Sequence, residues 1–170
     1  MRKFLCILIV LFVGTSTLVF AETRKIIKEN NEYGGETVLI TSSKGDDLYR
    51  VGIAKAISYS DSKGTVVKTE SFYNKDSARK GGIAKSISYS DSNGKVEKTE
   101  SFYTAEFARK NGRAKTIGYL DSNGKILKVE DFYTDKYAGK GGVAKVIGYL
   151  DSNGKVVKTE KYGKDGSLFK

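Results

Sequence analysis

The sequence predicts an all-β fold in which tandem 30-residue β-hairpin repeats form an antiparallel meander or a curled, solenoid-like sheet, with short helical turns between hairpins. Three observations support this prediction. Residues 51–80, 81–110, 111–140 and 141–170 align without a gap. Within each copy apolar and polar residues alternate with the two-residue period of a strand. A glycine-containing turn then divides each copy into two strands.

The chain begins with a predicted secretory signal peptide, residues 1–21. Arg2 and Lys3 precede an apolar run, and Val19 and Ala21 stand where signal peptidase reads small residues. Cleavage before Glu22 would yield a secreted or periplasmic protein without a transmembrane segment. An uncleaved leader that serves as a membrane anchor is the alternative, although its apolar run is short for a bilayer-spanning helix.

Residues 22–50 look like a degenerate copy of the repeat, and we expect them to cap the array at its N-terminal end. The four full copies occupy residues 51–170 with no low-complexity linker between them. We therefore treat residues 22–170 as one repeat domain. The sequence leaves open whether its sheet closes on itself.

The second copy, residues 81–110, illustrates the predicted hairpin. Its first strand ends at Asp91, and Gly94 fits a tight turn in which glycine takes a positive φ angle. Pairing of Asp91 with Lys95 fixes the register of the two strands. That register sets Ile83 opposite Tyr103, Ala84 opposite Phe102, Ile87 opposite Thr99, Tyr89 opposite Glu97 and Ser90 opposite Val96.

A short helix is predicted between consecutive hairpins. Thr104 is a good N-cap residue, Glu106 places an acid in the first turn, and Arg109 and Lys110 place bases in the last turn. Residues 74–80 and 134–140 repeat this pattern. Each repeat should therefore be a strand, a turn, a second strand and a helix of one or two turns.

The segments Tyr89 to Tyr103 and Tyr162 to Leu168 combine turn glycines with strand aromatics. In this respect the chain resembles MORN-like bacterial β-hairpin repeat proteins, some of which are described as antitoxin components. The 30-residue period is longer than that family's usual unit by roughly the helical connector. The resemblance implies a β-hairpin scaffold for binding or assembly, and it supplies no ligand or functional residue.

The composition argues against most enzyme classes. The 170 residues include no His, no Trp, no Pro and a single Cys, which lies in the predicted leader. Without His there is no imidazole general base, no Ser-His-Asp or Cys-His nucleophile system, and no ordinary zinc, copper or non-haem iron site. We therefore expect a non-enzymatic protein with no cofactor, no metal and no disulfide.

The formal net charge of +10, from 30 basic and 20 acidic residues, favours an anionic partner. Bases recur near the ends of the predicted helices, and stacked repeats would align them along one edge. We term the following residues the basic rim: Arg79, Lys80, Arg109, Lys110, Arg113 and Lys140. An anionic cell-envelope polymer would fit this rim, whereas export disfavours nucleic acid. The alternative is a solvated edge whose bases complement the helix dipoles.

Aromatic residues also recur every 30 positions, and stacked repeats would align them in columns. These residues are Tyr59, Tyr89, Tyr119 and Tyr149, with Tyr73, Tyr103, Tyr133, Phe72, Phe102 and Phe132. We interpret the columns as core packing, and a platform for sugar rings or extended polymers is the alternative.

Two other recurring patterns are interpreted as structural features, not as a catalytic or a metal site. Lysine and glutamate alternate on each second strand, as at Lys98 and Glu100, which predicts charge ladders rather than the carboxylate pair of a glycosidase. Asp91 and Asn93 lack the further oxygen ligands of a calcium loop and fit turn chemistry instead.

The sequence thus predicts an exported, non-enzymatic repeat protein that acts as a binding or envelope-associated interaction module. A protein-binding module of the immunity or inhibitor type, with an extracytoplasmic protein as partner, is the first alternative. A carboxylate-dependent glycan hydrolase is the second.

Overall fold

The computed structural model describes residues 26–169, which form one ten-stranded antiparallel sheet with short helices between the hairpins. The strands are β1 (Ile26–Asn30), β2 (Gly34–Thr41), β3 (Ile53–Asp61), β4 (Val66–Tyr73), β5 (Ile83–Ser90), β6 (Val96–Tyr103), β7 (Arg113–Leu120), β8 (Ile126–Tyr133), β9 (Lys145–Leu150) and β10 (Val156–Tyr162). The helices are α2 (Asp47–Arg50), α3 (Lys75–Gly81), α4 (Ala105–Asn111) and α5 (Asp135–Gly141). The predicted signal peptide, residues 1–21, lies outside the described residues.

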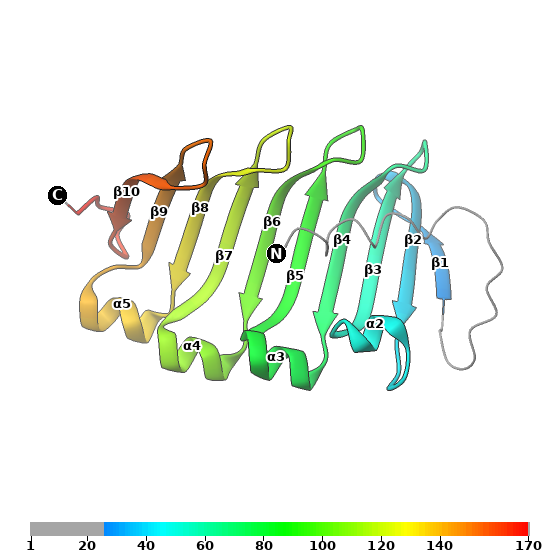
Figure 1. Cartoon of the computed structure of the whole chain (residues 1–170), viewed down its shortest axis with the longest axis horizontal. Coiled ribbons are helices and arrows are strands. Elements are labelled where there is room, and N and C mark those ends of the chain that lie inside the picture. The colour runs from blue at the N-terminus through cyan, green and yellow to red at the C-terminus, as the bar shows by residue number, and fades with distance from the viewer. Residues whose placement is uncertain (1–25, 170) are drawn as a thin grey trace.

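The strands pair in chain order from β1 to β10, so the predicted antiparallel meander of hairpin repeats is confirmed. Figure 1 shows the strands side by side, with the helices along one edge of the sheet and most hairpin turns along the other. The sheet is open, with β1 and β10 at its two ends. None of the helices that the structure describes is long and apolar enough to cross a membrane.

Each full repeat closes its hairpin with the predicted turn. The backbone N–H of Asp91 donates to the carbonyl oxygen of Lys95 at 2.8 Å, and Gly94 has a φ angle of 78°. Asp91 Oδ1 accepts hydrogen bonds from the backbone N–H groups of Asn93 and Lys95, both at 2.9 Å. The aspartate at the start of each turn is therefore explained by local backbone hydrogen bonding.

The predicted register is correct at both ends of the hairpin and wrong by one residue in the middle. Ile83 pairs with Tyr103 and Ser90 with Val96, as expected. Between them, Tyr89 pairs with Lys98 rather than Glu97. Register shifts at Ala84 on β5 and at Glu97 on β6 cause the difference.

These two bulges decide which side chains share a face. Directly paired residues of an antiparallel sheet project to the same side. Ile87 therefore lies beside Glu100 instead of Thr99, and Lys85 lies beside Phe102. The same pairing recurs in the hairpins β3–β4 and β7–β8, so it is a property of the repeat.

Capping residues fix the length of each seven-residue helix. In α4 the Thr104 hydroxyl accepts from the N–H of Phe107, and Gly112 ends the helix in the left-handed conformation at φ 76°. The N–H of Thr104 also donates to the carbonyl oxygen of Gly82, the C-cap of α3, at 2.7 Å. The phenyl ring of Phe107 packs where a side chain on Gly82 would lie. Each helix is thereby tied to the one before it.

The sheet buries few apolar side chains because it is a single layer. Among the described residues the buried apolar side chains are Ile53, Ala56, Ile87, Ile117, Ala138 and Ile147. Ile87, Ile117 and Ile147 form a central row on one face, where Glu70 and Glu100 are buried as deeply. The interior of this protein is therefore a mixed row of isoleucine and glutamate rather than an apolar core between two layers.

Replacing Gly82 with Ala tests the coupling between consecutive helices. Gly82 has a φ angle of 73°, and an added Cβ would overlap the ring of Phe107. We expect Gly82→Ala to lower the free energy of unfolding by about 2 kcal/mol, measured by urea denaturation. Gly81→Ala is the matched control because a Cβ there meets open space. Equal losses in the two variants would contradict the proposed packing.

Candidate functional site

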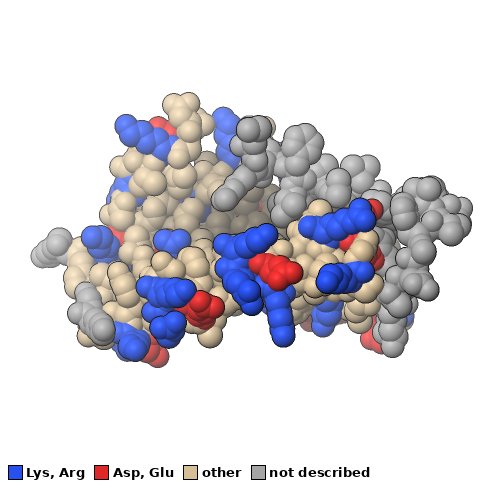
Figure 2. Space-filling model, turned by 60° about the horizontal axis from the view of Figure 1, so that its bottom comes forward, with Lys and Arg blue, Asp and Glu red and all other residues tan. Residues whose placement is uncertain are grey.

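The basic rim lies along the helical edge of the sheet, as predicted for most of its members. Arg79 and Lys80 are exposed in the last turn of α3, and Arg109 and Lys110 occupy the same positions in α4. Figure 2 shows Lys and Arg side chains gathered along this edge, interrupted by acidic ones. Lys140 belongs to α5, but its side chain lies outside the part of the chain that is described.

Two members of the basic rim are paired with acids. Lys110 Nζ lies 2.8 Å from Glu106 Oε1, and its hydrogen bond lowers the pKa of Glu106. Arg113 is the first residue of β7, where its guanidinium lies 3.1 Å from Asp131 Oδ2. Arg79, Lys80 and Arg109 form no salt bridge with other described residues and are the cations most available to a ligand.

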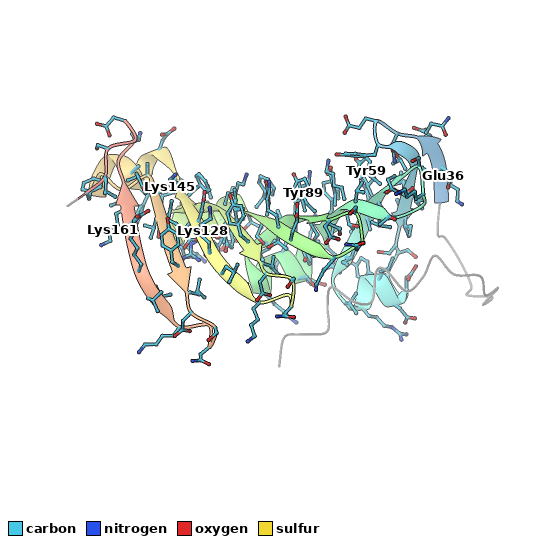
Figure 3. All side chains as sticks on the ribbon, turned by 90° about the horizontal axis from the view of Figure 1, so that it is seen from above. Glu36, Tyr59, Tyr89, Lys128, Lys145 and Lys161 are labelled. Carbon is cyan, nitrogen blue, oxygen red and sulfur yellow. The ribbon has the colours of Figure 1, made fainter. Side chains whose placement is uncertain are left out.

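The structure reveals a second candidate surface, on the face of the sheet that carries the buried isoleucines. Three rows of side chains run across strands β3 to β10. We term these rows the lysine–aromatic face. The first row is Tyr59, Lys68, Tyr89, Lys98, Tyr119, Lys128, Tyr149 and Lys158. The second is Ile57, Glu70, Ile87, Glu100, Ile117, Glu130, Ile147 and Glu160, and the third is Lys55, Phe72, Lys85, Phe102, Lys115, Phe132, Lys145 and Tyr162. Figure 3 shows Tyr59, Tyr89, Lys128 and Lys145 along this side of the sheet.

Two central glutamates each bridge two lysines from different repeats. Glu70 lies 2.7 Å from Lys68 Nζ of its own repeat and 2.5 Å from Lys85 Nζ of the next. Glu100 lies 2.8 Å from Lys98 and 2.7 Å from Lys115 in the same way. Burial alone would raise the pKa of Glu100, but the hydrogen bonds and charges of Lys115 and Lys98 outweigh it and lower that pKa.

The lysines also lie against aromatic rings. In the first row Lys98 Nζ is 4.3 Å from the ring centroid of Tyr89 and Lys128 Nζ is 3.8 Å from that of Tyr119. In the third row Lys85 Nζ lies between two rings, 5.0 Å from Phe72 and 5.9 Å from Phe102. These distances are within the range of cation–π attraction, which holds each ammonium at a fixed height above the sheet.

The predicted aromatic columns exist, but they divide between the two faces. Tyr59, Tyr89, Tyr119 and Tyr149 share a row, whereas Tyr103 projects from the opposite face, where it stacks on Phe107 at 4.6 Å. The tyrosines of the lysine–aromatic face are only half-buried, since no second layer of described residues covers them. They are therefore surface groups that neighbouring lysines support, rather than an enclosed core.

Sequence reasoning found the lysines, glutamates and aromatics but did not place them on one face. The extra residue at the start of the second strand is Glu97, Leu127 or Val157 in successive repeats, so no shared residue type marks the bulge. A strict two-residue alternation pairs every residue with one on the opposite strand, so it assigns a partner to a bulge residue that has none.

Comparisons with known proteins do not assign a function. No protein-family model matches the chain, and no curated protein is similar enough in sequence to be matched. No group of three or more possible metal-ligating side chains occurs within residues 26–169. The function must therefore be inferred from the geometry of the two surfaces.

Replacing Glu100 with Gln tests the bridge between repeats. The variant leaves Lys98 and Lys115 without their shared carboxylate, so we expect the free energy of unfolding at pH 7 to fall by about 1–3 kcal/mol. The matched control, Glu160→Gln, should lose less, because Glu160 has one lysine partner and that lysine is 63% exposed. Urea denaturation of both variants measures the difference.

Comparing Glu100→Gln with wild type also tests how the stabilisation by Glu100 depends on pH. Because the pKa of Glu100 is lowered in the folded protein, its contribution to stability is present above its unfolded pKa of about 4.3 and is lost as the pH falls through the folded value. The gap between wild type and Glu100→Gln should therefore close on acidification from pH 6 toward pH 3. A constant gap over this range would contradict the ion-paired assignment.

Proposed function

We propose that the protein is an exported, non-enzymatic interaction module that holds an anionic envelope polymer at its basic rim. The observation that carries this proposal is the recurrence of Arg-Lys pairs at the same exposed positions of α3 and α4. The predicted leader supports a site of action outside the cytoplasm, and the excess of basic residues supports an anionic ligand. The ligand is a polyanion because these cations follow one another along an edge of the sheet.

The scaffold holds the basic rim at a regular spacing. Neighbouring strands lie about 4.8 Å apart, so equivalent residues of successive repeats lie about 10 Å apart. The backbone N–H groups of Asn74, Thr104 and Thr134 donate to the carbonyl oxygen of a glycine just after the preceding helix, at 2.7–2.8 Å, and fix the helices relative to one another. The helices therefore present these cations to a polyanion at a fixed spacing.

The state of the glutamates supports a non-enzymatic role. A glycosidase needs one carboxyl group with a raised pKa to act as the general acid. Glu70, Glu100 and Glu160 instead have lowered pKa values, despite the opposing effect of burial on the first two, because lysines bind them. These carboxylates are held in the ionised state that suits ion pairing.

Charge-neutral variants of the basic rim test the proposal. The triple variant Arg79→Gln, Lys80→Gln and Arg109→Gln removes three exposed cations that have no salt bridge within the described part of the chain. We expect it to bind long-chain polyphosphate at least about tenfold more weakly than wild type at 50 mM salt, and to show a shallower salt dependence. Isothermal titration calorimetry at 50 and 200 mM salt measures both quantities.

The matched control removes three cations from the opposite edge. Lys63, Lys95 and Lys155 are exposed in the hairpin turns, and replacing them with Gln gives the same net charge as the rim variant. Near-normal binding by this control supports the basic rim as the site. Equal losses in both triple variants would show that only net charge matters and would overturn the proposal. A partner protein from an envelope extract that stays bound at high salt would instead favour the immunity-type alternative.

A further inference from the structure

The lysine–aromatic face carries an excess of one positive charge in every repeat. Its outer rows contain two lysines per repeat, and its central row contains one glutamate. The lysines of the face are Lys55, Lys68, Lys85, Lys98, Lys115, Lys128, Lys145 and Lys158, and the glutamates are Glu70, Glu100, Glu130 and Glu160. Ion pairing within the face therefore leaves one uncompensated ammonium charge for each step of about 10 Å.

We propose that this face binds an extended acidic polysaccharide with one carboxylate per disaccharide, lying across the strands from β3 to β10. The inference goes beyond the proposed rim, because it assigns a second site on a different surface with a narrower class of ligand. Like the proposed function, it assumes that the protein binds a ligand and is not an enzyme, but it does not depend on the basic rim.

The spacing of charges along the ligand distinguishes this polysaccharide from other polyanions. A disaccharide unit of an extended glycan has about the same length as one repeat, so one carboxylate per disaccharide meets one excess lysine charge. A nucleic acid strand carries a phosphate every ~3.4 Å, several for each repeat, and would leave most of its charges without a partner on this face. Polyphosphate is denser in charge still and suits the exposed cations of the basic rim better.

The polar groups of the face suit a ligand rich in hydroxyls. The hydroxyls of Tyr89 and Tyr119 make no hydrogen bond to other described residues, whereas Tyr59 and Tyr149 contact glutamates at 3.5 and 3.1 Å. An ammonium group has three donors, and Lys98 uses one of them on Glu100. Both groups can therefore donate to sugar hydroxyls or carboxylates without breaking the bridge that joins the repeats.

The face is also ordered in advance of binding. Lys98 and Lys115 are each held by a glutamate and at least one ring, and their side chains are only 32% and 29% exposed. Phe102 and Phe132 lie half-buried between the lysines, where their edges offer apolar contact to the C–H groups of a sugar. A ligand would then bind without paying for the ordering of long flexible side chains.

The experiment uses a hyaluronan octasaccharide as a probe with one carboxylate per disaccharide, titrated calorimetrically into the protein without its leader. We expect the variant Lys98→Gln with Lys128→Gln to bind at least about tenfold more weakly than wild type. The control Lys95→Gln with Lys155→Gln, which removes the same charge from the turns, should bind within about threefold of wild type. The carboxyl-reduced octasaccharide should bind weakly to all three. The proposal would be overturned if wild type bound the carboxyl-reduced and the native octasaccharide equally well. Equal losses of affinity in the two double variants would also overturn it.

Lysine footprinting on wild-type protein keeps the test independent of folding in the variants. Bound octasaccharide should protect Lys85, Lys98 and Lys115 from reductive methylation and leave Lys80 and Lys110 reactive. Protection confined to Lys80 and Lys110 would overturn the proposal and transfer the glycan to the basic rim. The rim triple variant separates the two sites, because it should keep hyaluronan binding while losing polyphosphate. If the rim triple variant bound polyphosphate as well as wild type, the proposed rim function would fail and the proposed glycan site would stand.

Discussion

An ion pair across the boundary between repeats is the interaction on which the rest of the structure depends, and it is formed by Glu70 with Lys85 and by Glu100 with Lys115. A single-layer sheet has no opposing layer to bury an apolar stripe, so side chains on the sheet face must reinforce the backbone pairing of β4 with β5 and of β6 with β7. Glu70 and Glu100 do this by binding one lysine of their own repeat and one of the next. Helix capping adds a second connection at the edge, through the contact of Phe107 with Gly82. Together they make the array one body with two repetitive surfaces.

The repeat, the hairpin turns and the connecting helices were all predictable because each depends on local chemistry. Asp91 and Gly94 determine their turn through nearby backbone groups, and Thr104 and Gly112 determine the helix between them. The bulges at Ala84 and Glu97 were not predictable, because a single unpaired residue interrupts neither strand and leaves no local turn signal. Missing them placed Glu100 and Phe102 on the wrong face, and the lysine–aromatic face could not be seen in the sequence.

The two surfaces differ in how their charges are used. Arg79, Lys80, Arg109 and Lys110 of the basic rim are exposed in the last turns of α3 and α4, and they stand at an edge that a polymer can follow. Most lysines of the other face are half-buried and contact rings, and the glutamates of the central row compensate half of their charge. The same periodic spacing therefore supports both proposals, a dense polyanion at the basic rim and a sparse one on the lysine–aromatic face.

A double-mutant cycle between Lys115 and Glu100 tests the central role of the cross-repeat pair most directly. The cycle compares Lys115→Gln, Glu100→Gln and the double variant with wild type by urea denaturation. We predict a coupling free energy of at least about 1 kcal/mol, clearly above that of the exposed Glu106 and Lys110 pair within α4. A coupling no larger than that of the helical pair would contradict the account.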